Sequence, residues 1–293
     1  MAGTPPADIA TDAALVSQLL AEQHPELQHL PVRFVRAGWD NALFRLGDCL
    51  AVRLPRRESA VSLLVQEQYW LPKLAPTLPV AIPVPQRLGQ PSQQYPWPWS
   101  IVSWLPGQTA DQTLLTAVHG QQLGQFLRSL HIAAPEHAPY NPFRSVSLGE
   151  RAAGIEERLA RLAKQTAVVT PALRSHWHRA LHTPMDVAPT WIHGDLHPHN
   201  VLVTATEITG VIDWGDMARG DRATDLAALW MLLETPRVRQ AAIDAYGEIS
   251  AATLARAKGW ATVFGVLLLE ARLADGSCFG SIGQTILQRV VQE

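Results

Sequence analysis

The stretch WIHGDLHPHNVLV, residues 191–203, sets three histidines, an aspartate and an asparagine between two short apolar runs. The apolar runs are typical of short buried strands. Gly194 and Pro198 disfavour a regular helix between them, so we expect the polar residues to lie in a loop. Which of these side chains takes part in chemistry depends on the sequence around them.

A second polar motif, GVIDWGD at residues 210–216, follows closely. NVLVT and ITGVID predict a hairpin, which would put Asn200 and Asp213 at adjacent strand ends. An amide oxygen and a carboxylate so placed are ligands for Mg²⁺ when nucleotide phosphates supply the others. Asp195, in the loop before, is suited to orient an alcohol and to accept its proton. Together the three residues predict a site for phosphoryl transfer.

A zinc site built from His193, His197 and His199 is one alternative. The i, i+4 spacing of His193 and His197 suits a helix, which the glycine and the proline of this stretch disfavour. We therefore expect His197 and His199 to be loop residues, and His193 to hydrogen-bond to the backbone. An ordinary polar loop is the other alternative, and it accounts poorly for all three residues of the predicted phosphoryl-transfer site.

The composition is that of a globular protein. The chain has 293 residues, 47% of them hydrophobic and 17% charged, with a net charge of −2. This length suits one large domain or two lobes that share a cleft, and the charge does not favour nucleic acid as a partner. Two cysteines, no basic stretch before an N-terminal apolar core, and a longest apolar run (VFGVLLL) too short for a bilayer predict a cytoplasmic protein without a membrane partner.

The first hundred residues predict a β-rich arrangement with two helices. Residues 8–23 have the apolar stripe of an amphipathic helix. Residues 32–57 alternate apolar and polar side chains and predict three antiparallel strands, the last two joined by a tight turn at Gly47. Residues 58–75 have helical periodicity, and we expect Pro72 to kink or stop that helix.

The rest of the chain is mainly helical. SIVSWLPGQ predicts a strand that ends at Pro106-Gly107, a candidate linker. Helical patterns follow in TLLTAVHGQQLGQFLRSLHIA, GERAAGIEERLARLAKQ and LRSHWHRALH. The predicted fold class is therefore α+β, with a small antiparallel β-rich N-lobe at residues 1–104 and a larger, mainly helical C-lobe at residues 105–293.

One acidic residue of the N-lobe stands out from its surroundings. Glu67 shares a helical face with Leu64, Leu71 and Leu74, so it interrupts an apolar stripe. A buried carboxylate needs a cation, and Arg53 on the strand LAVRLP is the natural partner. Such a pair, between the third strand and the following helix, holds nucleotide phosphates in kinase lobes. The alternative is that both residues are exposed surface charges.

These motifs resemble those of a known family. HGDLHPHN and IDWGD are similar to the catalytic loop and the metal-binding motif of the aminoglycoside phosphotransferases, which have a protein-kinase-like two-lobed fold. GWDNALFRLGDCLAVRLPRR, EQYWLPKLAP and YPWPWSIVSWLPG resemble that family's small lobe and hinge. The resemblance extends from about residue 30 to residue 275, with the motifs in the same order. It implies a small-molecule kinase that uses Mg²⁺ and either ATP or GTP.

The resemblance also implies residue roles. Asp195 would orient or deprotonate the acceptor hydroxyl, while Asn200 and Asp213 would bind Mg²⁺. Asp225 would brace the C-lobe, and the loop RAGWDNALF would cover the phosphates. The residues implied on the nucleotide side are Arg53 and Glu67 for the phosphates, Val102 for the base pocket, and Ser103 and Leu105 for backbone contacts to the base.

Three positions depart from the family pattern. Arg53 stands where kinases have lysine; it keeps the charge and can bind phosphate in a bidentate manner, so we expect nucleotide binding to be retained. The phosphate loop has a single glycine, Gly38. His199 stands where relatives often have a small residue.

The acceptor is predicted only as a small molecule with an alcohol group. An aminoglycoside is the first expectation, and a macrolide or another small alcohol is the alternative. A cationic acceptor would need carboxylates beside the site, and the candidates by position are Asp216, Asp221, Glu234, Glu270 and Asp275. A hypothesis from another class is a non-catalytic, nucleotide-binding kinase-like protein, which only the arginine in place of lysine favours.

Overall fold

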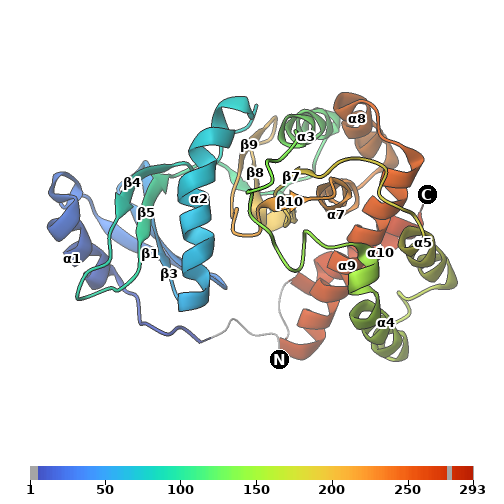
Figure 1. The fold of residues 1–293 in the computed structure, drawn as a ribbon, viewed down its shortest axis with the longest axis horizontal. Helices are drawn as coiled ribbons and strands as arrows, with labels where there is room; N and C mark the ends of the chain where they lie inside the picture. Colours follow the sequence, from blue (N-terminus) through green and yellow to red (C-terminus); the bar gives the residue numbers. More distant parts are fainter. Residues whose placement is uncertain (1–5, 276–278, 293) are drawn as a thin grey trace. The chain divides into compact units, whose positions relative to one another are not determined.

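The computed structural model describes residues 6–275 and 279–292, and its chain divides into two compact units (Figure 1). The β-rich unit consists of Thr4–Pro106 and Gly210–Gly215. The helical unit contains Gly107–Thr209 and Asp216–Glu293. No single cut in the chain separates the units, because the six residues around Asp213 group with the β-rich unit. The functional boundary after residue 104 stays a prediction.

The β-rich unit is built on a five-stranded sheet whose paired strands are all antiparallel. The three strands expected within residues 32–57 are confirmed, and Gly47 makes the turn between the last two with a φ of 56°, a conformation that favours glycine. The strand order is β1-β2-β3-β5-β4. The strands are β1 (Val32–Ala37), β2 (Asn41–Leu46), β3 (Leu50–Pro55), β4 (Pro85–Gly89) and β5 (Trp99–Ser103).

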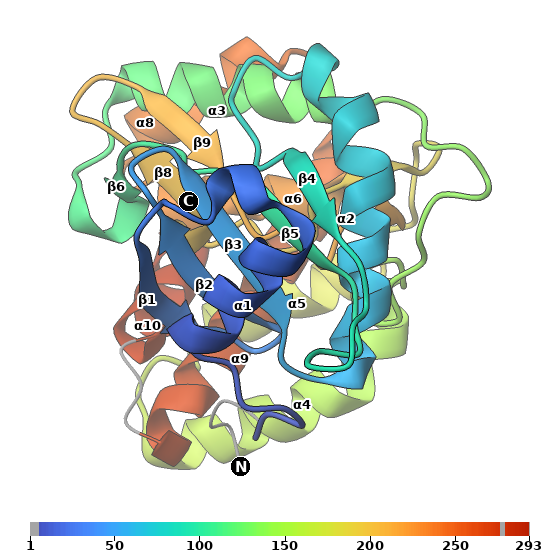
Figure 2. The ribbon, with the colours of Figure 1, turned by 90° about the vertical axis from the view of Figure 1, so that its left-hand side faces the viewer.

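Helices α1 (Ala13–Gln23) and α2 (Val61–Leu74) flank this sheet (Figures 1 and 2). The first helix begins later than its apolar pattern predicts, because the side chain of Asp12 accepts a hydrogen bond from the Leu15 amide at 2.8 Å and caps it. The buried residues of α1 join the core of the sheet. That core contains Val16, Leu19, Leu20, Ala42, Phe44, Leu46, Val52, Leu54, Tyr95, Trp99 and Ile101.

Pro72 does not stop α2, which continues to Leu74. Of the two expected effects of Pro72, a kink or a stop, the stop does not occur. A proline inside a helix removes one hydrogen bond to the residue four positions earlier, here Gln68. At the last turn this loss concerns a single bond, and the backbone continues into a 3-10 turn, Ala75–Thr77.

The helical unit contains the helices that the sequence predicts after the candidate linker. Two small sheets, β10-β7 and β6-β8-β9, accompany these helices. The helices are α3 (Ala117–Leu130), α4 (Leu148–Gln165), α5 (Pro171–Leu181), α6 (Ala223–Leu226), α7 (Ala228–Leu232), α8 (Pro236–Tyr246), α9 (Ala251–Asp275) and α10 (Phe279–Val291). The strands are β6 (Gln108–Thr109), β7 (Thr190–Ile192), β8 (Val201–Val203), β9 (Ile208–Val211) and β10 (Ala218–Gly220).

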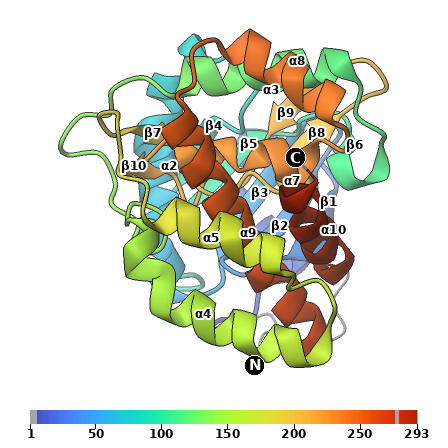
Figure 3. The ribbon, with the colours of Figure 1, turned by 90° about the vertical axis from the view of Figure 1, so that its right-hand side faces the viewer.

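Helix α9 is longer than the apolar run VFGVLLL that it contains. Its residues 251–271 have a mean hydropathy of 1.2, which by length and composition alone would allow a membrane span. However, 67% of that window is buried inside the protein, and the helix packs against α5 and α10 (Figure 3). This is the behaviour of a core helix.

Helices α3 and α8 approach each other closely through two glycines. A Cβ added at Gly124 would lie 2.2 Å from the carbonyl oxygen of Ala242, and one added at Gly120 would lie 2.5 Å from that of Val238. Only a residue without a side chain allows the two backbones this separation.

This packing predicts opposite effects for two glycine-to-alanine changes. Gly124→Ala should lower the free energy of unfolding by about 1–3 kcal/mol, because the new methyl group forces the helices apart. Gly154→Ala, on an exposed face of α4 with nothing within 4 Å, should raise it by about 0.5–1 kcal/mol through helix propensity. Urea denaturation measures the free energy of unfolding of both variants. Equal changes in the two variants would contradict the close approach of α3 and α8.

Candidate active site

The loop after β7 is held by a buried carboxylate. The amides of His193 and Gly194 donate hydrogen bonds to the two oxygens of Asp225, at 2.7 and 2.8 Å. Gly194 has a φ of 84°, and a Cβ there would lie 2.7 Å from the carbonyl oxygen of Asp216. Asp225 is therefore the brace that the family resemblance implies, and it fixes the backbone immediately before Asp195.

Asp195 lies among three polar side chains. Its carboxylate is 3.5 Å from Arg144 Nη2, 3.3 Å from His197 Nε2 and 3.2 Å from Asn200 Nδ2. Burial opposes ionisation of this carboxyl, but His197, Arg144 and His193 outweigh burial and hold its pKa well below the usual range. The residue is therefore a carboxylate at neutral pH, and it is held in place by neighbours.

The amide of Asn200 has one orientation that satisfies its contacts. Its Nδ2 lies 3.0 Å from the carbonyl oxygen of Asp195 and 3.2 Å from that residue's Oδ2. Both of these atoms are acceptors, so the nitrogen must face them and Oδ1 must turn the other way. Asn200 is 2% exposed and directly precedes β8.

The ring nitrogens of the three histidines in the loop contact polar groups of the protein. His193 Nδ1 accepts from the Asp195 amide at 3.2 Å, as the sequence predicts for a histidine that holds the backbone. His197 Nδ1 accepts from the amide of His199, whose Nε2 lies 3.5 Å from Asp111. Within residues 6–275 and 279–292, no group of three or more His, Cys, Asp or Glu side chains is placed to hold a metal ion.

In the β-rich unit, Arg53 and Glu67 form the predicted ion pair. Two guanidinium–carboxylate contacts join them, one from Arg53 Nη2 to Glu67 Oε1 at 3.0 Å. The residues are 7% and 2% exposed, so the alternative of two surface charges was wrong. Burial raises the pKa of the Glu67 carboxyl, and Arg53 opposes that rise.

Asp213 belongs to the same unit as this ion pair. Its segment is held by the Val211 amide, which donates to Ala81 O at 3.0 Å, and by Trp214 Nε1, which donates to Val211 O at 3.0 Å. Asp213 is exposed and has a φ of 65°, a conformation that non-glycine residues seldom adopt and that is concentrated at functional sites. Its charge acts on both Arg53 and Glu67.

The hairpin expected between Asn200 and Asp213 is confirmed. Strands β8 and β9 are neighbours in one sheet, and the amide of Thr204 donates to Glu207 O at 2.9 Å in the turn that joins them. Asn200 immediately precedes the first strand, and Asp213 follows the second.

The residues predicted to contact the base lie at the end of β5. Val102 is 3% exposed and pairs with Ala51 of β3, while Ser103 pairs with Leu50. Leu105 is half-buried. Nothing in these contacts tests base binding, so these three roles stay predictions.

The turn between β1 and β2 is clamped from the end of β3. Arg56 donates to Gly38 O at 2.6 Å, and Arg57 pairs with Asp40 at 2.8 Å. Trp39 lies at the tip and is 56% exposed. The single glycine of this loop is therefore accompanied by two arginine contacts that limit the movement of the turn.

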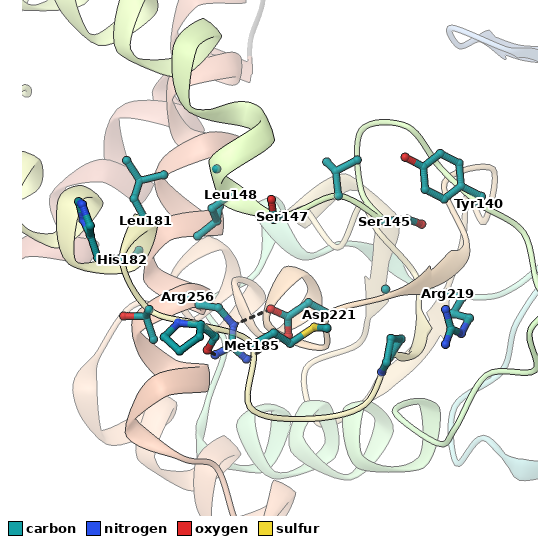
Figure 4. A pocket seen from close by; sticks show the side chains of 17 residues that line it. Tyr140, Ser145, Ser147, Leu148, Leu181, His182, Met185, Arg219, Asp221 and Arg256 are labelled. Atoms are coloured by element: carbon teal, nitrogen blue, oxygen red, sulfur yellow. Dashed lines mark hydrogen bonds and ion pairs between the residues drawn. The ribbon is translucent and has the colours of Figure 1, made fainter.

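The helical unit also contains a cavity of about 530 Å³ (Figure 4). Tyr140, Ser145 and Val146 line one part of it, whereas Asp195 is not among its lining residues. Asp221 is the one acidic residue of the lining, and it accepts a hydrogen bond from Arg256 at 2.6 Å. The cavity is thus distinct from the surroundings of Asp195.

Comparison with known proteins identifies the family. The model of a phosphotransferase enzyme family matches residues 31–260, most of the chain. The chain belongs to this family. Solved structures that resemble this phosphotransferase include the GDP complex of wild-type aminoglycoside 2′-phosphotransferase-IIIa, 20% identical over 96% of this chain and 98% of that one, with a TM-score of 0.69. The apoenzyme of a macrolide 2′-phosphotransferase from Brachybacterium faecium is 22% identical over 94% and 97%, with a TM-score of 0.65.

At these identities the likeness concerns the fold, and it confirms the expected protein-kinase-like arrangement of an antiparallel N-terminal sheet and a helical C-terminal region. An ADP-bound aminoglycoside phosphotransferase has the same fold, with 18% identity over 95% and 98% of the chains and a TM-score of 0.61.

One residue beside Asp195 was not predicted from the sequence. Arg144 lies 3.5 Å from Asp195 and 3.1 Å from Asp216, and Asn141 holds Asp216 from the other side at 2.7 Å. Arg144 is 51 residues from Asp195 in the chain and lies in the loop between α3 and α4. No periodicity or motif marks it, because only the tertiary fold brings the two residues together.

The buried pair of this phosphotransferase predicts a stability effect that depends on pH. Arg53→Met should lower the free energy of unfolding by about 3–5 kcal/mol at pH 7, because Glu67 then stays buried without a cation. Its folded-state pKa would rise, so the loss should grow as pH increases above the unfolded carboxyl value of about 4.3. Urea denaturation at pH 5 and pH 8 measures this.

Two controls accompany that measurement. The double variant Arg53→Met/Glu67→Leu should recover most of the loss, because no charge is left buried. Arg87→Met removes a half-exposed arginine, 3.7 Å from Glu26, and should change stability by less than about 1 kcal/mol. A destabilisation of Arg53→Met that is the same at both pH values would contradict the uncompensated-carboxylate account.

Proposed function

We propose that the protein is a small-molecule kinase that transfers the γ-phosphoryl group of ATP or GTP to a hydroxyl of its acceptor. The observation that carries this proposal is Asp195, an ionised carboxylate held by a fixed loop next to Asn200. Phosphoryl transfer requires an oriented nucleophile and neutralised phosphate charge rather than covalent participation of the protein. The family supplies the reaction class, a phosphotransferase.

Asp195 would accept a hydrogen bond from the acceptor hydroxyl and take its proton as the oxygen–phosphorus bond forms and the bond from the γ-phosphorus to the nucleoside diphosphate breaks. The neighbours of Asp195 keep it ionised at neutral pH, so it can accept the hydrogen bond of the acceptor hydroxyl; its lowered pKa makes it a weak base that takes the proton only as the phosphoryl group is transferred. Its contacts with Arg144, His197 and Asn200 limit its rotation, which favours one direction for the attacking oxygen.

Asn200 and Asp213 would hold Mg²⁺. The amide oxygen of Asn200, which turns away from Asp195, and the exposed carboxylate of Asp213 are the hard oxygen donors that this ion prefers. When bound, the ion neutralises charge on the nucleotide phosphates. The strained φ of Asp213 supports a functional role for its position.

The nucleotide would be held mainly by the β-rich unit. Arg53, oriented by Glu67, offers a planar guanidinium to the phosphates, and the backbone of Ser103 and Leu105 would meet the base beside Val102. The GDP, ADP and ATP complexes among the similar structures support a nucleotide donor.

The acceptor is an antibiotic-like alcohol in this proposal. An aminoglycoside is the sequence-based expectation, and the similar structures include enzymes named for aminoglycosides and for macrolides. The one observation that favours a non-catalytic, nucleotide-binding protein is the arginine in place of the kinase lysine. The kinase hypothesis predicts that bound nucleotide is turned over, and the non-catalytic hypothesis predicts that it is not.

Asp195→Asn tests the catalytic proposal. It should lower acceptor-dependent release of nucleoside diphosphate by at least about 10²-fold, because the general base is lost while the shape is kept. Nucleotide affinity, measured by calorimetry, should stay within about twofold. Nucleotide that binds to the unchanged protein but never turns over, with any acceptor or with water, would favour the non-catalytic hypothesis.

The metal assignment has its own test. Asp213→Ala should raise the Mg²⁺ concentration for half-maximal turnover by at least about tenfold, because a charged ligand is lost. Asp48→Ala removes an exposed aspartate from the β2–β3 turn and should leave that concentration unchanged. Equal Mg²⁺ dependence in both variants would remove Asp213 from the proposed metal site.

A further inference from the structure

The acidic residues that the sequence offers for a cationic acceptor lie mostly within ion-pair distance of arginine. Four of the five candidates have described side chains, and each of them is paired with arginine; the side chain of Asp275 lies outside the described part. The pairs are Asp216 with Arg144 at 3.1 Å, Asp221 with Arg256 at 2.6 Å, Glu234 with Arg289 at 3.6 Å, and Glu270 with Arg158 and, at 2.5 Å, with Arg161.

Such pairing changes what these acids can attract. A carboxylate that faces a guanidinium a few ångströms away presents little net charge to a third group. An incoming ammonium group would also meet the arginine of each pair. Paired in this way, these four acids offer weak binding to a polyamine.

Arg151, on the first turns of α4, is in the opposite situation. In the described part of the chain no carboxylate pairs with it, and its Nε is buried without a hydrogen-bond partner. Its guanidinium lies 5.4 Å from the ring of Phe143, which is 57% exposed. A half-buried arginine with an unsatisfied donor leaves binding capacity that an anion would fill.

The electrostatic surroundings of Arg151 support the same conclusion. Burial lowers the pKa of its guanidinium, and so do the neighbouring charges of Arg144 and Arg158. A cation disfavoured by burial and by like charges is stabilised when an anion binds to it.

The position of Arg151 relates it to the catalytic carboxylate. Phe143, against which it lies, is the residue before Arg144, and Arg144 contacts Asp195 at 3.5 Å. Asn141 fixes this turn, since its Oδ1 accepts from the amides of Phe143 and Arg144 at 2.8 and 3.1 Å. Arg144 lies against two carboxylates, whereas no carboxylate among the described residues pairs with Arg151.

We propose that the acceptor carries a carboxylate or phosphate group in addition to its hydroxyl, and that Arg151 binds this group beside the Arg144–Asp195 pair. The inference rests on the proposed kinase function and narrows its substrate class. It replaces a polycationic acceptor with a hydroxylated acid or a phosphate ester. Phe143 would supply an apolar surface for the part of the acceptor between the two groups.

Anion binding tests the site without a known acceptor. Malonate and inorganic phosphate, each titrated into nucleotide-free protein at constant ionic strength, should bind to the wild type, and Arg151→Gln should raise the Kd of the preferred anion at least fivefold. Arg161→Gln removes the same charge from an exposed position on the same helix and should leave that Kd within twofold. Preference for malonate indicates a carboxylate, and preference for phosphate indicates a phosphate ester. Equal Kd values for wild type and Arg151→Gln, or no binding of either anion, would overturn the proposal.

Turnover separates this proposal from the kinase proposal. A panel of hydroxy acids, sugar phosphates, neutral sugars and aminoglycosides is tested for acceptors that stimulate the release of nucleoside diphosphate. The active acceptors should be anionic. Arg151→Gln should raise the KM of these acceptors at least tenfold, while Arg161→Gln does not. Turnover of aminoglycosides with a KM unaffected by Arg151→Gln would reject the anionic acceptor and leave the kinase function standing. Nucleotide turnover that survives Asp195→Asn would instead reject the kinase assignment of the loop.

Discussion

The arrangement of the helical unit depends on one buried carboxylate, that of Asp225. It is 1% exposed, and besides the two loop amides it lies 3.4 Å from His131 Nε2. His131 follows α3 and meets the hydroxyl of Tyr246, at the end of α8, at 2.9 Å. A buried charge is tolerated only when donors surround it, so Asp225 holds the loop and connects it to the ends of two helices. The direction of Asp195 follows from this arrangement.

Burial with compensation also explains why arginine occurs where it does. Arg53 is almost fully buried with a single carboxylate, Glu67, and the planar guanidinium matches that carboxylate with two contacts, which an ammonium group does not. The substitution of the kinase lysine is therefore compatible with an intact pair. Arg144 likewise lies between two acids, because its Nη2 is 3.5 Å from Asp195 and 3.1 Å from Asp216, so its charge is shared between them.

The sequence was informative where a local pattern has a physical cause. The three strands, the hairpin that precedes Asp213 and the Arg53–Glu67 pair follow from alternation and from a charge on an apolar helix face. Helix ends were less predictable, because the start of α1 depends on a cap by Asp12 and α2 tolerates Pro72. Arg144 and Arg151 could not be found, since their importance arises from contacts and from missing contacts in the tertiary structure. The grouping of residues 210–215 with the β-rich unit is likewise a tertiary property.

The choice of acceptor in this fold then depends on which charged side chains have no ion-pair partner in the protein. The catalytic residues are a short set that many acceptors can share, because phosphoryl transfer asks only for an oriented hydroxyl and neutralised phosphates. Discrimination comes from groups that lose or gain solvation when the acceptor binds. A carboxylate already paired with arginine, as Glu270 is, gains little from an ammonium group, whereas Arg151 gains a partner for a buried donor. The number of acids near the site is therefore a poor guide to the charge of the acceptor, because acids that are already paired with arginine do not count.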